Sequence, residues 1–549
     1  MKVFLTAVVL FLTETQYFCA AKVRDYLNRV EGKDEIQSSL GESVVKETQR
    51  HVSGPDNRVV IETYLDQILD HFDEKGGRED TFLQRYFYSD DFVSKDPEYS
   101  GKTYAFLCVG GEGPDLDFGV LINSVHCSGD MLETAQAMHD QGHSVHLFAL
   151  EHRYYGYSYP DFQTGSAVSN ENLTYLSSKQ ALADIAHFIS YMNGEIKDEV
   201  TQQARSLKHF LEPFEHQDGH NGVDRWITFG GSYPGMLSAW ARLKYPHLVF
   251  AAVSNSAPVQ PKLDFAGYYS VVQNDLKYNE IGGSDDCLAF IKEGHEDIKE
   301  ALFGEGSDAE ARSRLASMFN ICDEKALEDD MNARIFAGDG VINIPAQEND
   351  PSCTESLCNI EKICDHITRS EYVEPVDVLA DISNKQQHDE CLVVDWNGTL
   401  QYLASPAARF EGIRSWLWQT CTEFGFYQTC ESVEDCPFTP VHTVSQDLQI
   451  CEVAFGISAD RVKENVQNTI EYYGGRNLET SRIVFVNGDV DPWTAEAITS
   501  DKHFPTLWVP EASHHFWTHV PKSSDSIWVV AARELIQVQI QSWLNEESQ

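Results

Sequence analysis

Basic side chains are scarce in this chain of 549 residues. Lysine and arginine together number 41 against 86 aspartates and glutamates, which leaves a formal net charge of −45 at pH 7. Because such a chain is repelled by nucleic acids and by anionic lipids, neither is expected as a partner. The acidity suits a protein of an acidic compartment, where protonation relieves repulsion between carboxylates, and it equally suits a merely solvating acidic surface.

Long apolar runs are lacking beyond the N-terminus. There, one basic residue precedes an apolar stretch at 3–12 and small residues at 19–21. This pattern predicts a secretory signal peptide over residues 1–21, with cleavage near residue 20 or 21. No later run reaches the ~18 apolar residues of a membrane span, so the mature chain is expected to be soluble, without membrane insertion. Two sequons, at Asn172 and Asn397, permit N-glycosylation of a secreted chain.

The cysteines contain no Cys-x-x-Cys pair, which makes a zinc site the weaker interpretation. Of the 13 cysteines, Cys19 lies in the predicted leader, and the other 12 form the even number favoured in an oxidising compartment. Ten of them lie between Cys287 and Cys451, so most disulfides are predicted in that interval. Cys108 lies in an apolar run, where a buried free thiol and half of a bridge are both open interpretations.

One segment, 226–237, passes from a β-rich stretch through two glycines and a serine into a helix-forming sequence. The glycines allow a turn too tight for side chains beside Ser232, so that its hydroxyl stands clear of the sheet, as in a nucleophile elbow. Pro234 occupies the position where the general elbow has glycine, and proline is tolerated in the first turn of a helix. Proline is also expected to push Tyr233 out of the α region.

Two further residues follow in the order serine, aspartate, histidine that α/β-hydrolases use. Asp491 comes after an apolar strand at 483–486, and His514 after a short strand at 506–510. His514 would take the Ser232 proton, while a carboxylate on its other ring nitrogen would hold the tautomer and stabilise the imidazolium. Each residue alone is an ordinary turn or surface residue, but together they predict a catalytic triad.

The same segments predict an oxyanion hole. The N–H of Tyr233, directly after the serine and at a helix N-terminus, is the expected first donor. Gly111, in the glycine-rich turn 110–113 after a strand, is the expected second donor. This chemistry uses no metal and no cofactor, and none is predicted.

The pattern of elements predicts the domain organisation, and no internal repeat or low-complexity tract interrupts it. Strands alternate with helices up to about residue 258, which is typical of α/β folds, and the strand–loop pattern resumes after 481. We predict an α/β-hydrolase domain from 22–265 and 475–549, interrupted by a helical, disulfide-rich cap domain at 266–474. Strands are predicted at 104–109, 144–150, 226–229, 483–486 and 506–510, and helices at 178–192, 235–243, 309–319 and 459–473.

These motifs resemble the family of lysosomal Pro-X carboxypeptidase, dipeptidyl peptidase II and thymus-specific serine protease. The matching segments span nearly the whole mature chain and are 67–72, 110–113, 151–156, 230–235, 421–423 and 487–493. Segments 241–246 and 418–427 are most similar to the thymus-specific branch. The resemblance implies a hydrolase domain capped by a helical domain, and a peptidase that acts near chain ends, often after proline. It points to Ser232, to Asp491 rather than Asp489, and to His514.

The leading hypothesis is therefore a serine exopeptidase of the secretory pathway, extracellular or lysosomal, with peptide substrates. Carboxypeptidase and dipeptidyl peptidase activities both stay open, as does a homodimer. Met236 and Trp493 are expected to line a small apolar slot suited to a proline ring. Two alternatives are an esterase or lipase on the same fold, and a catalytically silent hydrolase-fold glycoprotein that only binds partners.

Overall fold

The computed structural model describes residues 50–546, except 54–57, 74–79, 97–98, 163–164, 195–222, 339, 389, 407, 409–411 and 433. The predicted signal peptide lies outside the described residues. Within them the chain forms two compact units. The sheet unit contains the residues up to Gln260, then 469–489 and those from Glu496 onward, and the helical unit contains 261–468 and 490–495. The domain boundaries expected near 265 and 475 stay a prediction.

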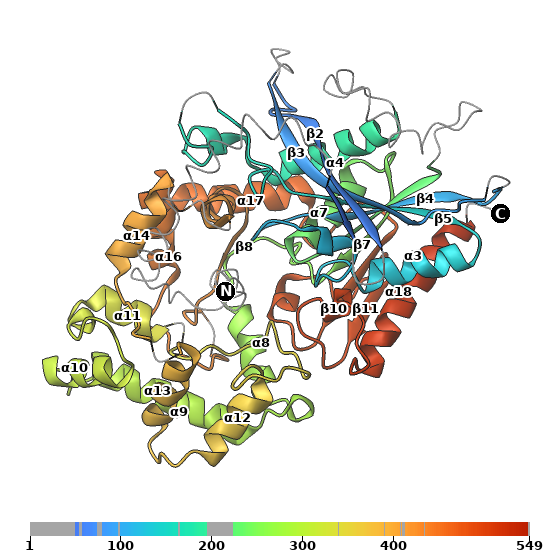
Figure 1. Ribbon diagram of the computed structural model, residues 1–549. Coiled ribbons are helices and arrows are strands. Elements are labelled where there is room, and N and C mark those ends of the chain that lie inside the picture. The colour runs from blue at the N-terminus through green and yellow to red at the C-terminus, as the bar shows by residue number, and fades with distance from the viewer. Residues whose placement is uncertain are drawn as a thin grey trace. The chain divides into compact units, whose positions relative to one another are not determined.

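A nine-stranded sheet forms the centre of the sheet unit (Figure 1). Its strands are β1 (Arg50–Ser53), β2 (Val59–Ile68), β3 (Thr81–Phe92), β4 (Thr103–Val109), β5 (Ser144–Leu150), β6 (Arg225–Gly231), β7 (Val249–Asn255), β10 (Ile483–Gly488) and β11 (Thr506–Val509). Their spatial order is β1-β2-β3-β5-β4-β6-β7-β10-β11. The pairs from β5 to β11 in this order are parallel, whereas β1–β2, β2–β3 and β3–β5 are antiparallel. The carboxyl ends of β4, β6, β7, β10 and β11 therefore share one edge.

Helices cover both faces of this sheet. Every residue of β4, β5, β7 and β10 is buried, as expected for parallel strands that are covered on both sides. On one face, α3 (Asp130–Asp140) and α18 (Ile527–Glu546) pack against each other and against the strands (Figure 1). The other face carries α4 (Ser178–Met192) and α7 (Tyr233–Lys244). The predicted α/β-hydrolase fold is confirmed.

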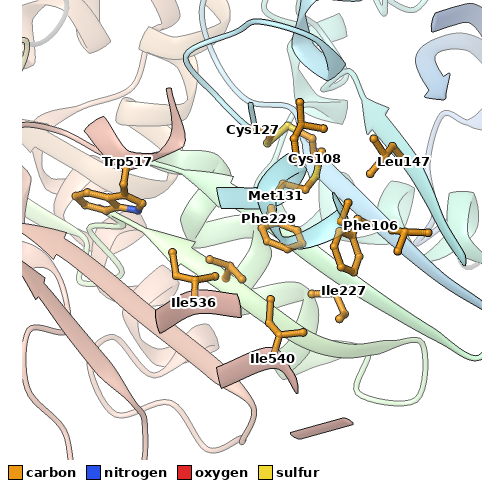
Figure 2. Packing of buried hydrophobic residues seen from close by; sticks show 14 of the residues in the cluster. Phe106, Cys108, Cys127, Met131, Leu147, Ile227, Phe229, Trp517, Ile536 and Ile540 are labelled. Carbon is orange, nitrogen blue, oxygen red and sulfur yellow. A yellow bond between two sulfur atoms is a disulfide. The ribbon is translucent and has the colours of Figure 1, made fainter. Parts of the chain in front are cut away.

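The core under α3 and α18 draws its side chains from strands that are far apart in the sequence. Figure 2 shows Phe106 of β4 and Phe229 of β6 beside Met131 of α3 and Ile540 of α18. The rings of Phe106 and Phe229 lie 5.1 Å apart. On the opposite face, Phe188 of α4 meets Phe148 and Trp226 edge to face, with ring centroids 5.6 and 6.1 Å away. Apolar burial on both faces makes the sheet a rigid base for the loops at its edge.

The helical unit is built mainly from helices. These are α8 (Gly267–Asp275), α9 (Asp285–Phe303), α10 (Ala309–Met318), α11 (Asp330–Gly338), α12 (Ile360–Arg369), α13 (Pro375–Gln386), α14 (Trp396–Ala404), α15 (Ile413–Gln419) and α16 (Val444–Ile450). Two π-helical turns, η8 (Thr420–Phe424) and η9 (Cys451–Phe455), follow α15 and α16, and β8 (Lys262–Asp264) pairs in parallel with β9 (Gly425–Tyr427). The chain leaves the unit within α17 (Ala459–Tyr473).

Disulfides are concentrated in the helical unit, as predicted. The five bridges there are Cys287–Cys364, Cys322–Cys391, Cys353–Cys358, Cys421–Cys451 and Cys430–Cys436. The free-thiol interpretation of Cys108 is wrong, because Cys108 is bonded to Cys127 in the sheet unit. A sequence cannot show that the turn before α3 brings Cys127 back to β4.

For several elements, local sequence signals predicted the first and last residue correctly. Helices α4 and α17 and strand β5 have the predicted bounds, and the Ser177 side chain caps α4 by accepting the Gln180 N–H at 3.2 Å. Strand β6 is longer than predicted, because Gly230 and Gly231 continue its ladder with β7. No helix within the described ranges is long and apolar enough to cross a membrane.

Candidate active site

Ser232 lies at the turn between β6 and α7, where the sequence predicted a nucleophile elbow. Its backbone has φ 62° and ψ −131°, a conformation that residues other than glycine rarely adopt and that costs about 1–3 kcal/mol. Its N–H donates to the carbonyl of Asn255 at 2.9 Å, and its own carbonyl accepts the Met236 N–H at 3.0 Å, which starts the helix. Ser232 is half-buried, so it stays accessible at the strained turn.

The glycines beside Ser232 are required by close contacts. A side chain at Gly230 would collide with the carbonyl of Pro234, in the first turn of α7. At Gly231, a Cβ would lie 2.8 Å from Cγ of His515. The elbow and the loop after β11 are therefore in direct contact.

The two expected oxyanion donors both lie at the first turn of α7. Tyr233 is the first residue of α7, and first-turn N–H groups point out of a helix N-terminus. The expectation that Tyr233 leaves the α region is wrong, since Ser232 takes up the unusual backbone conformation instead. Gly111 lies against the Pro234 ring, where a Cβ would collide with it. The Tyr233 hydroxyl is hydrogen-bonded to Nε2 of His152 at 2.9 Å, which directs the side chain into the core.

His514 follows β11, as predicted, and is 6% exposed. The rings of His514 and His515 lie 4.5 Å apart. Burial, together with the charges of His514, His519 and His126, holds the pKa of His515 well below its usual value. His515 is therefore neutral beside the elbow, and the sequence did not single it out for this position.

Asp491 and Asp489 differ in their surroundings. Asp491 lies three residues beyond β10, in the short segment grouped with the helical unit, and is completely buried. Its Oδ1 accepts the Trp493 N–H at 3.0 Å, and its carbonyl accepts the Thr494 hydroxyl at 2.7 Å. Asp489 is half-buried, and its N–H donates to the carbonyl of Val509 at 3.3 Å.

Glu112 is a titratable residue in the loop after β4, at the carboxyl edge of the sheet, and the sequence did not single it out. It directly follows Gly111, and burial raises its pKa to about 7, against smaller lowering effects of its own backbone N–H and the charge of His514. Its Oε2 is buried and has no hydrogen-bond partner among the described residues. An acidic residue inside the Gly-Gly-Glu-Gly turn was the available signal.

The two residues expected to line a proline slot are both buried. Met236 is completely buried in the first turn of α7. Trp493 is 3% exposed, and its Nε1 donates to Oε1 of Gln347 at 2.8 Å. Its ring lies 5.3 Å from Phe265 and 5.4 Å from Phe426, within an aromatic cluster of the helical unit. The slot itself stays a prediction.

The two sequons differ in accessibility. Asn397 is exposed in the first turn of α14. Asn172 is half-buried, and its side-chain amide donates to the carbonyl of Ser166 at 2.9 Å. Glycosylation at either position stays a prediction, and Asn397 is the more accessible acceptor.

Comparison with known proteins agrees with the motifs. The family model described as serine carboxypeptidase S28 matches residues 67–536. The chain is 31% identical to thymus-specific serine protease of Mus musculus, over 99% of this chain and 97% of that protein. It is 32% identical to the Homo sapiens protein of the same name, over 88% of this chain and 87% of that one. Lysosomal Pro-X carboxypeptidase of Bos taurus is 26% identical over 88% of each chain. The predicted resemblance is confirmed, and the chain belongs to the serine carboxypeptidase S28 family of serine peptidases.

Proposed function

We propose that this protein is a serine exopeptidase that hydrolyses peptide bonds near chain ends, after proline, through an acyl-enzyme. Membership of the S28 family supports the serine peptidase chemistry. The preference for proline is supported by relatives that are lysosomal Pro-X carboxypeptidases. The same relatives, together with the disulfides, support a place in the secretory pathway.

In this mechanism Ser232 Oγ attacks the carbonyl carbon of the scissile bond while His514 accepts its proton. Asp491 orients His514 and stabilises the imidazolium. The N–H groups of Tyr233 and Gly111 donate to the oxyanion of the tetrahedral intermediate. His514 then gives its proton to the leaving amine, and water hydrolyses the acyl-enzyme by the same steps with His514 as base.

The backbone of Ser232 is the observation that carries the proposal. A non-glycine residue with positive φ at the start of a helix is strained, and such strain persists only where surrounding contacts enforce it. Here the ladder of β6 with β7 and the bond from Ser232 N–H to Asn255 enforce it. A tight turn alone would be satisfied by glycine, so a serine held in this conformation favours a nucleophile.

The test is Ser232→Ala, assayed on a proline-containing peptide and with a fluorophosphonate probe. We expect at least a ~10³-fold loss of kcat and no probe adduct, with secretion unchanged. Ser238→Ala is the control, because it removes another serine hydroxyl of the same segment, a buried one in α7 that donates to Oγ1 of Thr228 at 2.8 Å. Near wild-type hydrolysis by Ser232→Ala would refute the assignment.

Which chain end is read is tested with the same peptide. Three versions are compared, with both ends free, with the amino end acetylated, and with the carboxyl end amidated. A dipeptidyl peptidase loses the acetylated substrate, and a carboxypeptidase loses the amidated one. Equal turnover of all three versions would contradict an exopeptidase.

A further inference from the structure

Asn255 and Ser256 follow one another at the carboxyl end of β7. They are hydrogen-bonded to both neighbouring strand ends and to the histidine loop, the segment after β11 that carries His514. Strand β7 lies between β6, which leads to Ser232, and β10, which leads to Asp491. It carries no member of the predicted triad. Both residues are buried, with exposed fractions of 1% and 0%.

Asn255 holds the backbone of the nucleophile and the histidine loop at the same time. Its carbonyl accepts the Ser232 N–H at 2.9 Å. Its side-chain Oδ1 accepts the Nε1–H of Trp517, three residues beyond His514, at 2.8 Å (Trp517 is labelled in Figure 2). Its Nδ2 donates to Oδ2 of Asp130 at 2.8 Å, at the start of α3. The planar amide is well suited to this position, because it carries a carbonyl acceptor and an NH2 donor on one rigid group.

Ser256 makes the second set of bonds. Its Oγ accepts the N–H of His515 at 2.8 Å, and its own N–H donates to the carbonyl of Val486 in β10 at 2.7 Å. Its φ of 46° lies in the left-handed region, which a non-glycine residue occupies only when its contacts enforce it. One strained residue thus connects β10 with the loop that carries His514.

We infer that Asn255 and Ser256 are positioning residues that hold Ser232 and His514 in register for proton transfer. The inference rests on the proposed function, since it assigns these residues a role only if Ser232 and His514 react. Neither residue is a catalytic residue, because each acts through the groups that it binds. Asn255 binds the Ser232 N–H and the Trp517 indole, and Ser256 binds the His515 N–H. Misplacement by about 1 Å costs up to about 100-fold in rate, so the bonds matter for kcat and not for substrate affinity.

The test exchanges the two partners of the buried amide. Asn255→Asp places two carboxyl groups in contact, which repel each other unless one of them is protonated. Asp130→Asn leaves one amide oxygen for two donors, the Asn255 amide and the Met131 N–H, so one of these two hydrogen bonds is lost. Each single variant therefore weakens the contact between positions 255 and 130. The double variant restores it with donor and acceptor reversed, and it still offers oxygens to Trp517 and to the Met131 N–H, which Asp130 Oδ1 accepts at 2.8 Å. We expect a 10- to 100-fold loss of kcat in each single variant, unchanged KM, and recovery to within a few-fold in the double variant.

Ser256→Ala tests the same connection with the loss of a single oxygen, which leaves the buried volume nearly unchanged. It should lower kcat and the rate of fluorophosphonate labelling at Ser232 by about 10-fold or more at unchanged KM. Ser238→Ala is again the control and should change neither kcat nor the labelling rate. All rates are divided by the concentration of folded protein, which is obtained from the thermal unfolding curve of each variant under the same conditions.

The outcomes separate the two proposals. If the wild-type protein is not labelled at Ser232, the proposed function fails and the inference fails with it. If Ser232 is labelled in the wild type while Ser256→Ala and both single variants keep wild-type kcat, the positioning role alone is refuted. If the single variants are less stable but keep the wild-type kcat per folded molecule, the role of these residues is merely structural and the positioning role is likewise refuted.

Discussion

Glu112→Gln should make the stability of the protein less dependent on pH. Burial raises the pKa of Glu112 from 4.5 to about 7. The folded protein therefore binds this proton more tightly than the unfolded chain does. The stabilisation is fully present below pH 4.5 and is lost as the pH rises through about 7. At about 1.4 kcal/mol per pH unit, the difference between the two pKa values corresponds to about 3 kcal/mol.

The measurement is the thermal midpoint of wild type and Glu112→Gln between pH 4.5 and pH 8. Glutamine does not titrate. The thermal midpoint of the variant should therefore rise relative to that of the wild type as the pH rises, by on the order of 5 °C across this range. Asp130, whose pKa burial raises to about 6, titrates in both proteins and cancels in the comparison. Glu479→Gln, at an exposed carboxylate, is the control and should run parallel to the wild type. Parallel curves for Glu112→Gln as well would refute the reasoning.

Two predictions concern the proposed triad and pocket. Asp491→Asn should lower kcat by about 10⁴-fold, because the amide favours the wrong histidine tautomer, whereas Asp489→Asn should cost much less; comparable losses in steady-state assays would mean that the wrong carboxylate was chosen. Trp493→Ala should reduce the preference for proline over lysine and glutamate by about 1–3 kcal/mol, the usual scale of apolar-pocket discrimination. Matched peptides that differ only at this position measure it, and equal kcat/KM in the wild type would show that no such slot exists.

The elements that the sequence predicted well are those specified by neighbouring residues. Helix α4 has an apolar face and a serine cap directly before it, and both signals are local. The end of β6 was missed because Gly230 and Gly231 look like turn residues, whereas pairing with Ser254 and Asn255 keeps them in the sheet. That pairing joins segments that are about 24 residues apart, and no local pattern indicates it.

The same distinction applies to the site. Gly-Gly-Ser-Tyr-Pro-Gly predicts the elbow at Ser232 because the geometry of the turn is set by the glycines within it. Glu112 carries no local mark of its raised pKa, which arises only when the folded chain removes water from it. The interval that contains most disulfides followed from the cysteine positions, but the partner of Cys108 did not.

By itself, then, the sequence determined the α/β class and the location of the turn at Ser232, because both depend on residue types at short spacing, and it supplied the order of the predicted triad. Only the tertiary structure decided what holds these residues. The bonds from Asn255 to Trp517 and from Ser256 to His515 join residues 262 and 259 positions apart. Such bonds exist because parallel strands bring their carboxyl ends to one edge of the sheet, and the spacing of the residues along the chain carries no trace of it.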